Sequence, residues 1–326
     1  MSKLAAARLL LGFALSLMWC AQAGAYLAYV SNEKSNTLSV IDTNTWQVTR
    51  TIKVGQRPRG IAVTHDQKYV LVAASDDDTI QMIDRPTHRI VGKLPSGPDP
   101  ESFVQDPAGK ILYVANENDN AVTIIDIAQR SRLADVPVGV EPEGMAISPD
   151  GKILVNTSET TNMAHFIDTD TRKIVANVLV DARPRYAEFK PDGSELWVSA
   201  EIGGTVSVID PDKRRVTKKI RFEIPGLRRE VIQPVGIRFT KDGKLGFVAL
   251  GPANRVAVID AATYQVTKYL LVGHRVWHVA LTSDEKFLLS TNGLSNDVSV
   301  IDVPPLKVIK TIQVGELPWG IAIARE

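Results

Sequence analysis

The chain has 326 residues, a formal net charge of +1 and a single cysteine. A nearly neutral chain is a poor candidate for nucleic-acid binding, which depends on a strongly basic surface. One cysteine cannot form an intramolecular disulfide or supply the thiolates of a zinc site, and it excludes a covalently attached c-type haem.

The first 25 residues are organised like an export signal. Lys3 and Arg8 form a basic start, and residues 9–19 form an apolar run that is short for a membrane span. Small residues follow, and residues 23–25 fit a cleavage site of the A-x-A type. We therefore expect cleavage before Tyr26 and a periplasmic mature protein without a membrane span.

Cys20 lies inside this signal, so the mature chain has no thiol. Export without disulfides suits a bacterial periplasm, where a large core is stable without covalent links. Lipid attachment to Cys20 is the alternative, and we disfavour it because Trp19 is a poor neighbour in a lipobox.

After the signal, a short pattern ending in Ile-Asp recurs along the whole chain. Its aspartates are Asp42, Asp84, Asp126, Asp168, Asp210, Asp260 and Asp302. They lie 42 residues apart, except for one step of 50 residues between Asp210 and Asp260. A constant period of this size indicates a repeat architecture, and the eight additional residues behave as a loop insertion.

Each repeat predicts four short strands separated by turns. In the second repeat the strands are residues 60–64, 69–73, 79–83 and 89–94. They are rich in Val, Ile, Leu and Thr, and turn residues lie between them. The first turn carries Asp-Gly at residues 150–151, 192–193 and 242–243. We expect these glycines to have the positive φ that tight hairpins require.

The second turn of each repeat carries a residue type that tolerates a left-handed backbone. These residues are Asn36, Asp78, Asn120, Asn162, Gly204, Asn254 and Asn296. The repeated aspartates begin the third turn. We interpret them as turn caps that accept bonds from nearby backbone N–H groups, rather than as a ring of metal or acid/base groups.

Seven units of four strands predict one all-β domain over residues 26–326, a seven-bladed β-propeller of four-stranded blades. The mature chain begins with the second strand of a blade and ends with an isolated first strand at residues 320–324. We therefore expect the C-terminal strand to complete the N-terminal blade, which closes the ring and leaves no open edge.

Two sets of motifs resemble known families. Tyr-Val-Ala-Asn at residues 113–116, followed by residues 122–126, resembles the YVTN family of β-propeller repeats. Residues 54–60, 96–101, 156–166 and 249–255 are similar to the β-propeller protein associated with catabolism that depends on pyrroloquinoline quinone (PQQ). This resemblance implies an exported protein that occurs with quinoprotein alcohol dehydrogenases and their cytochromes. It suggests a pathway but no reaction.

The informative positions are those where the repeats differ. In propellers, the loop into each inner strand and the second turn of each blade lie on one face, around the channel mouth. There we predict a binding face formed by Arg57, Arg59, Glu101, Glu141, Glu143, Glu159, Arg183, Arg185, Glu201, Arg275, Trp277, His278 and Trp319. The alternative is that these charges pair with one another across blades.

The sequence predicts no catalytic group, no cofactor and no metal site. The alternatives are a lactonase or lyase, for which Glu159, His165, Glu201 and His278 are the candidate acid/base residues, or an envelope scaffold. We interpret His165 as a hydrogen-bonded structural residue. His274 and His278 lie four residues apart in a loop, where this spacing has no meaning for a metal.

We therefore expect a monomer that binds a quinoprotein dehydrogenase or its cytochrome. The insertion within residues 221–233 would project from the same face, and it carries Phe222, Ile224 and Leu227. It is a docking flap or a tolerated loop, and both interpretations remain open here.

Overall fold

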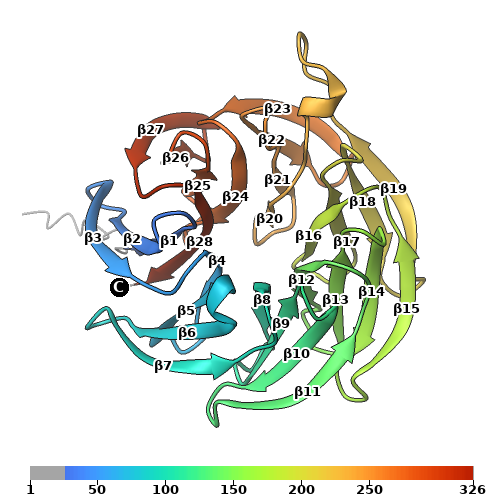
Figure 1. The fold of residues 1–326 in the computed structure, drawn as a ribbon. Helices are drawn as coiled ribbons and strands as arrows, with labels where there is room; N and C mark the ends of the chain where they lie inside the picture. Colours follow the sequence, from blue (N-terminus) through green and yellow to red (C-terminus); the bar gives the residue numbers. More distant parts are fainter. Residues whose placement is uncertain (1–25, 326) are drawn as a thin grey trace, which may run out of the picture.

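The computed structural model describes residues 26–325 as seven four-stranded antiparallel sheets, arranged as blades around a central axis (Figure 1). This confirms the seven-bladed β-propeller that the repeat period predicted. The predicted export signal, residues 1–25, lies outside the described residues. Between residues 26 and 325, no helix has the length and apolarity that a membrane crossing requires.

We number the blades I to VII along the chain and name the strands of each from the inner to the outer one. Blade I is β28 (Pro318–Arg325), β1 (Tyr26–Asn32), β2 (Thr37–Asp42) and β3 (Gln47–Lys53). Blade II is β4 (Pro58–Val63), β5 (Tyr69–Ala74), β6 (Thr79–Asp84) and β7 (Arg89–Pro95). Blade III is β8 (Pro100–Gln105), β9 (Ile111–Asn116), β10 (Ala121–Asp126) and β11 (Ser131–Pro137).

The other four blades follow the same order. Blade IV is β12 (Pro142–Ile147), β13 (Ile153–Ser158), β14 (Met163–Asp168) and β15 (Lys173–Leu179). Blade V is β16 (Pro184–Phe189), β17 (Leu196–Ala200), β18 (Thr205–Asp210) and β19 (Arg215–Arg221). Blade VI is β20 (Ile237–Phe239), β21 (Leu245–Ala249), β22 (Arg255–Asp260) and β23 (Gln265–Leu271). Blade VII is β24 (Val276–Leu281), β25 (Phe287–Asn292), β26 (Asp297–Asp302) and β27 (Lys307–Gln313).

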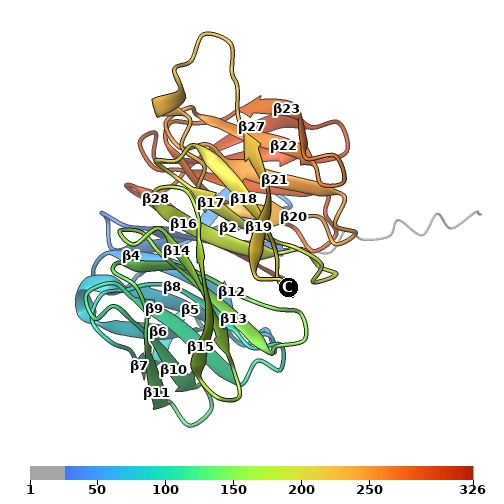
Figure 2. The same cartoon turned by 90° about the vertical axis from the view of Figure 1, so that its right-hand side faces the viewer.

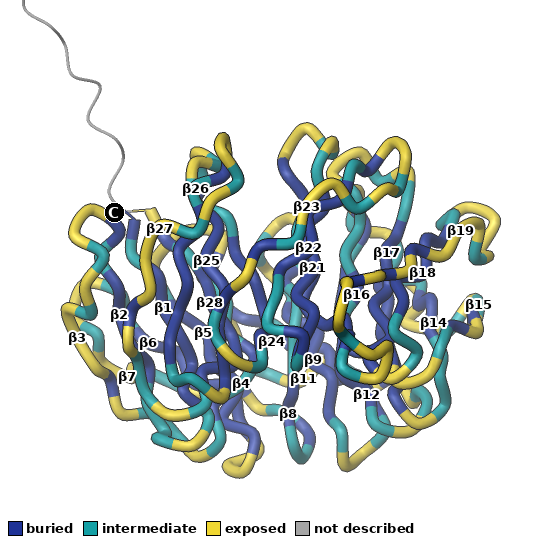
Figure 3. The backbone as a smooth tube through the Cα atoms, turned by 90° about the horizontal axis from the view of Figure 1, so that it is seen from above, coloured by how far each residue is buried: buried dark blue, intermediate teal, exposed yellow. Residues whose placement is uncertain are grey.

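The hydrophobic core is divided among the junctions between neighbouring blades. One cluster of buried side chains fills each of the seven junctions. Between blades V and VI, for example, Trp197 packs edge-on against Phe239 with 4.7 Å between ring centroids. Exposed positions are concentrated on the outer strands and loops (Figure 3). Both faces of each blade are covered, which explains why the sequence shows short continuous apolar runs.

The ring is closed within blade I, as predicted. Strand β1 pairs with β28 on one side and β2 on the other, so that Tyr29 lies opposite both Ala322 and Val40. The backbone N–H of Gly320 also donates to the Ser31 hydroxyl at 2.9 Å. The last strand of the chain therefore supplies the inner strand of the first blade.

The predicted turn conformations are confirmed. The second-turn residues are left-handed in all seven blades, with φ between 53° and 65°. The glycines of the Asp-Gly turns, Gly151, Gly193 and Gly243, have φ of 76°, 74° and 67°. These are the positions where a residue without a left-handed preference would be strained.

The second-turn side chains also link neighbouring blades, a contact that the repeat pattern alone does not predict. Asn162 Oδ1 accepts the backbone N–H of Arg183 at 2.9 Å, and Asn254 Oδ1 accepts that of Arg275 at 2.8 Å. We call this contact the Asx clamp. It occurs at six junctions, and the six residues that donate to it are Arg57, Asp99, Glu141, Arg183, Arg275 and Leu317. All six are themselves left-handed, with φ between 50° and 57°.

Six of the seven repeated aspartates accept hydrogen bonds from their own turns, and Asp302 has no such bond among those of the described residues. Asp168 Oδ1 accepts both the backbone N–H and the hydroxyl of Thr171 at 2.7 Å, and these bonds lower the pKa of Asp168. Asp260 is bound in the same way by Thr263. A carboxylate that is already occupied by its own turn does not form part of a metal or acid/base ring.

The insertion lies between β19 and β20 and extends from the edge of the ring (Figure 2). Phe222 and Ile224 are buried between blades V and VI, with Leu227 packed against them. The Tyr269 hydroxyl accepts the backbone N–H of Glu223 at 3.1 Å. The docking-flap interpretation is therefore wrong for these apolar side chains, because they anchor the loop to its own blades.

Candidate functional site

The face that we call the mouth face carries the loops into the inner strands and the second turn of each blade. The pairing of each inner strand is irregular at its start, as between Pro142 and Met145 in β12. Such irregularities bend a strand and redirect its side chains. The residue after the proline, such as Glu143 or Arg185, thereby comes to lie in the buried centre of the mouth face.

Four glutamates on the second turns are held on the same face by the backbone. The N–H groups of Glu33, Glu117, Glu159 and Glu201 donate to the carbonyls of the loop residues Leu317, Asp99, Glu141 and Arg183 at 2.8–2.9 Å. The second turn and the inner loop of one blade are thus joined directly. This confirms that the repeat places these glutamates at one equivalent position around the mouth.

Arg185 is the centre of the first ion-pair network. Its side chain is 5% exposed and contacts Glu143 at 2.8 Å, Glu201 at 3.7 Å and also Glu159. Burial acts against the charge of Arg185, but the three carboxylates raise its pKa. Burial raises the pKa of Glu143 well above its usual range. Burial also acts to raise that of Glu159, but Arg185 and the hydrogen bonds from Glu143 and Arg183 lower it.

Arg57 and Arg59 form a second network with the acidic residues of blade III. Glu101 is fully buried and accepts bonds from both arginines. Arg57 also pairs with Asp99, and Arg59 pairs with Glu33 at 3.3 Å. The partners belong to different blades, so the pairing alternative for these charges describes the structure correctly. Burial of this kind makes the arrangement sensitive to the loss of any one partner.

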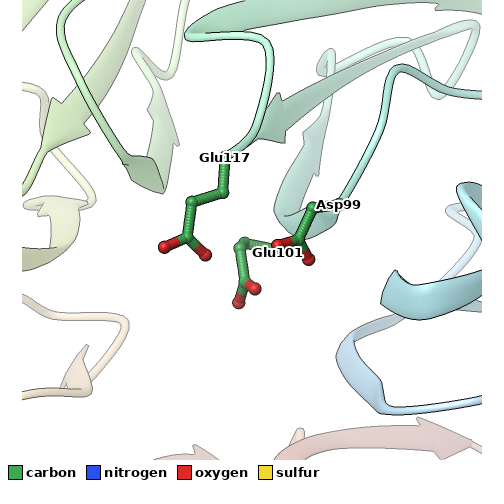
Figure 4. Close-up of side chains that lie close together, drawn as sticks. All are labelled: Asp99, Glu101 and Glu117. Atoms are coloured by element: carbon green, nitrogen blue, oxygen red, sulfur yellow. The ribbon is translucent and has the colours of Figure 1, made fainter.

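Three carboxylates of blade III and its loop lie close together: Asp99, Glu101 and Glu117 (Figure 4). Their nearest oxygens are within 4.8 Å of one another, a spacing that is compatible with a cation. However, Asp99 and Glu101 are already neutralised by Arg57 and Arg59. The arrangement is therefore better explained as an ion-pair network than as a metal site.

Glu117 is the member of this group without a recorded cation partner among residues 26–325. Burial, followed by the nearby charge of Glu101, raises the pKa of Glu117 to about 7. An acid whose pKa is higher in the folded chain binds more protons when folded, so the free energy of unfolding falls as the pH rises from about 4.5 through about 7.

Glu117→Gln should remove this pH dependence. We expect the stability of the variant relative to the parent to increase by roughly 1–2 kcal/mol between pH 5 and pH 8, after allowance for partial solvent screening. Urea unfolding at several pH values measures the difference. Glu223→Gln is the control, because Glu223 is 82% exposed in the insertion. A difference that stays constant with pH would show that Glu117 does not titrate in this range.

The two networks surround a polar cavity of about 290 Å³. We call it the mouth cavity, and it is lined by Arg57, Arg59, Asp99, Glu117, Arg183, Arg185, Glu201, Arg275 and Trp277. A second pocket of about 520 Å³ shares Arg59, Arg275 and Trp277 with it and adds the apolar side chains of Pro252, Leu294 and Leu317. The mouth therefore combines a charged centre with an apolar neighbouring pocket.

Two side chains distinguish this cavity from a closed ion-pair network. Arg183 is 48% exposed and is bound only through its Nε, to Glu159 at 2.6 Å and Glu201 at 3.5 Å, among the contacts of the described chain. Trp277 lies between two guanidinium groups, 4.2 Å from that of Arg275 and 5.5 Å from that of Arg185. The amino groups of Arg183 are thus free to bind an acceptor next to an ordered aromatic ring.

The structure brings together most of the predicted mouth residues. His278 and Trp319 lie deeper and contact each other, with 4.2 Å between ring centroids. Glu141 stands apart, since its carboxylate accepts a bond from Thr160. Glu117 was not among the predicted residues, although it occupies the same repeat position as Glu159, which the sequence shows directly.

The two histidines considered as acid/base residues, His165 and His278, lie in different environments. His165 Nε2 accepts the backbone N–H of Gly139 at 3.0 Å, and Nδ1 lies 2.7 Å from Asn177 Oδ1. Both ring nitrogens are used, so His165 is the structural residue that was predicted. His278 is buried, and this burial together with the charges of Arg185, Arg238 and Arg59 lowers its pKa to about 3.

Comparison with known proteins identifies the fold. A family model described as a seven-bladed β-propeller lactonase matches residues 23–137. No curated protein matches the chain. Hydrazine synthase from Kuenenia stuttgartiensis is similar over 84% of this chain and 92% of its own, with a TM-score of 0.75 and 23% identity.

Two other solved structures are similar over 92% of this chain and 99% of their own. One is a functionally unknown protein from Desulfotomaculum acetoxidans, with a TM-score of 0.78 and 19% identity. The other is a Bacteroides uniformis protein provisionally assigned as a 6-phosphogluconolactonase, with a TM-score of 0.75 and 16% identity. At these identities the likeness shows the fold alone, a β-propeller.

Proposed function

We propose that this chain is a non-catalytic binding propeller that docks a partner or ligand at the mouth cavity. The observation that carries the proposal is Arg183, whose free amino groups project into a cavity where the other charges are held by ion pairs. Fixed charges around an open donor favour recognition, because little reorganisation accompanies binding. Trp277 adds an aromatic contact next to this donor.

We further propose that the protein is exported to the periplasm and acts with a quinoprotein alcohol dehydrogenase or its cytochrome. The support for this step is the organisation of residues 1–25 and the sequence resemblance at residues 54–60, 96–101, 156–166 and 249–255. Capture with the mature protein from the periplasm of alcohol-grown cells, with mass spectrometry of what is bound, tests the pathway. Recovery of neither a quinoprotein nor a cytochrome would contradict it.

The partner that is captured allows a direct test of the mouth. Arg183→Gln should weaken its binding by roughly 10-fold at low ionic strength, because a charge-assisted hydrogen bond of about 1.5 kcal/mol is lost. The effect should be smaller at high salt, where exposed charges are screened. Isothermal titration calorimetry at two salt concentrations measures both effects.

Arg215→Gln is the matched control. Arg215 belongs to the same blade as Arg183, but it lies exposed on the outer strand β19. The Arg215→Gln variant should bind the partner with the affinity of the parent. Equal affinity of Arg183→Gln and the parent at both salt concentrations would place the interface elsewhere.

A lactonase is the second candidate, favoured by the family match at residues 23–137 and by Glu117, whose pKa near 7 is suitable for a general acid or base. The previously considered acid/base residues do not form such a site. His165 uses both ring nitrogens, while Glu159 and Glu201 are paired with arginines. Hydrolysis of a sugar lactone by the parent, lost in Glu117→Gln, would establish this candidate over the first.

A further inference from the structure

At the inner end of the mouth cavity, beginning at Arg59, three inner strands contribute side-chain nitrogens that have no hydrogen-bond partner among the described residues. They are Arg59 Nε on β4, His278 Nε2 on β24 and Trp319 Nε1 on β28. We call this set the throat. A buried donor without an acceptor destabilises the fold, so a group of them in one region points to a ligand.

The throat residues lie close to one another. His278 contacts Trp319 with 4.2 Å between ring centroids, and the Arg59 guanidinium lies 5.8 Å from the Trp319 ring. Arg185 Nε is not part of this set, because it lies 3.7 Å from Glu201 Oε2. The three nitrogens therefore belong to one region, although their strands come from blades I, II and VII.

A polar group lies beneath the throat. Arg238 Nη1 donates to Glu188 at 2.8 Å, and Arg238 Nη2 donates to the Tyr186 hydroxyl at 3.0 Å. The ring of Tyr186 in turn contacts His278 at 5.4 Å between centroids. Because these groups satisfy one another, they supply no acceptor to the throat.

The throat atoms determine which chemical class of ligand can bind to them. Guanidinium and indole N–H groups can only donate, and a neutral imidazole donates from Nε2 in one of its two tautomers. An ammonium group would find no acceptor among them. A dianion such as phosphate would meet the many carboxylates of the two mouth networks, and a monoanion meets less repulsion.

We propose that the throat is a subsite for the carboxylate of a small organic acid whose apolar remainder lies in the pocket beside Trp277. That pocket shares Arg59 with the throat and contains Leu294 and Leu317. The inference rests on the proposed function, since it names the group that enters from the mouth cavity. It adds a site and a ligand class to a surface so far defined only by its charges.

Indole N–H resonances of ¹⁵N-labelled protein test the proposal, with acetate and benzoate as probes. The Trp319 resonance, assigned by its loss in Trp319→Phe, should shift saturably with acetate at a Kd on the order of 1 mM. Benzoate should bind roughly 10-fold more tightly, because its ring enters the apolar pocket. Trp46 and Trp197 serve as internal controls, since both pack in junctions between blades.

His278→Phe should raise the Kd for acetate by at least about 5-fold, because the ring packing is kept while a donor is lost. His65→Phe, a change at an exposed turn residue, should leave the Kd unchanged. Unshifted Trp46 and Trp197 resonances in both variants show that the ring is folded. No saturable shift of Trp319 with either acid, or an equal shift with butylammonium, would overturn the proposal.

The same spectra separate this inference from the proposed function. If Trp277 responds to the acids and Trp319 does not, ligands stop at the mouth cavity; the throat subsite is then wrong and the mouth remains the docking site. If Trp319 responds while Arg183→Gln has no effect on partner binding, the throat binds carboxylates and the docking surface is elsewhere.

Discussion

Arg185→Leu is expected to destabilise the protein by roughly 3–5 kcal/mol, which is the usual cost of removing one partner from a buried ion-pair network. Arg185 is 5% exposed, and it contacts Glu143, Glu159 and Glu201. Its loss leaves these carboxylates buried with less compensating charge. Urea unfolding at pH 7.5 measures the change.

Arg183→Leu is the matched control, because Arg183 binds Glu159 and Glu201 but is 48% exposed. It should cost less than about 1 kcal/mol. The loss in Arg185→Leu should decrease as the pH falls toward 5, since protonation relieves unpaired carboxylates. Equal costs for the two arginines would show that Arg185 is not the centre of the network.

Deletion of residues 318–326 is expected to prevent folding to a soluble ring. The deletion removes all of β28, so β1 loses its partner and blade I loses its inner strand. It also removes Ile321 from the cluster between blades I and VII, and Ala324 from the cluster between blades I and II. An exposed strand edge next to two opened junctions favours aggregation.

Soluble yield, gel filtration and thermal unfolding measure this effect. Truncation after Arg325 is the control, because it keeps all of β28. A shortened chain that remains monomeric and unfolds at the temperature of the parent would contradict closure by β28. A soluble chain of much lower stability would still agree with it, as six blades would remain intact.

The fold was predictable because one pattern is repeated seven times. The period of 42 residues also identifies neighbours: Arg57 pairs with Asp99, and Arg59 pairs with Glu101, one period further along the chain. The left-handed second turns followed from Asn and Asp at one position. The Asx clamp could not be predicted in this way, because the residue that donates the hydrogen bond lies 21 residues away in the next blade.

The sequence predicts where the mouth residues lie around the ring, but not how deeply each side chain is buried. Arg183 and Arg185 flank one proline and look equivalent in the sequence, yet one is half exposed and the other is buried. The difference depends on the side chains that neighbouring blades direct toward the axis, which a single sequence does not show. For a similar reason the sequence left the role of the insertion open, since the side chains that bury Phe222 and Ile224 lie in two blades.

The Asx clamp holds the backbone of the mouth loops independently of the side chains that these loops carry. At six junctions an Asn or Asp of the preceding blade fixes the backbone of a residue such as Arg183 or Leu317, whatever side chain that residue carries. An arginine, an aspartate, a glutamate and a leucine all occupy the same left-handed position. Exchange of one of these side chains therefore leaves the backbone of the other five positions in place. In evolution or in the laboratory, the specificity of such a ring can be altered one blade at a time.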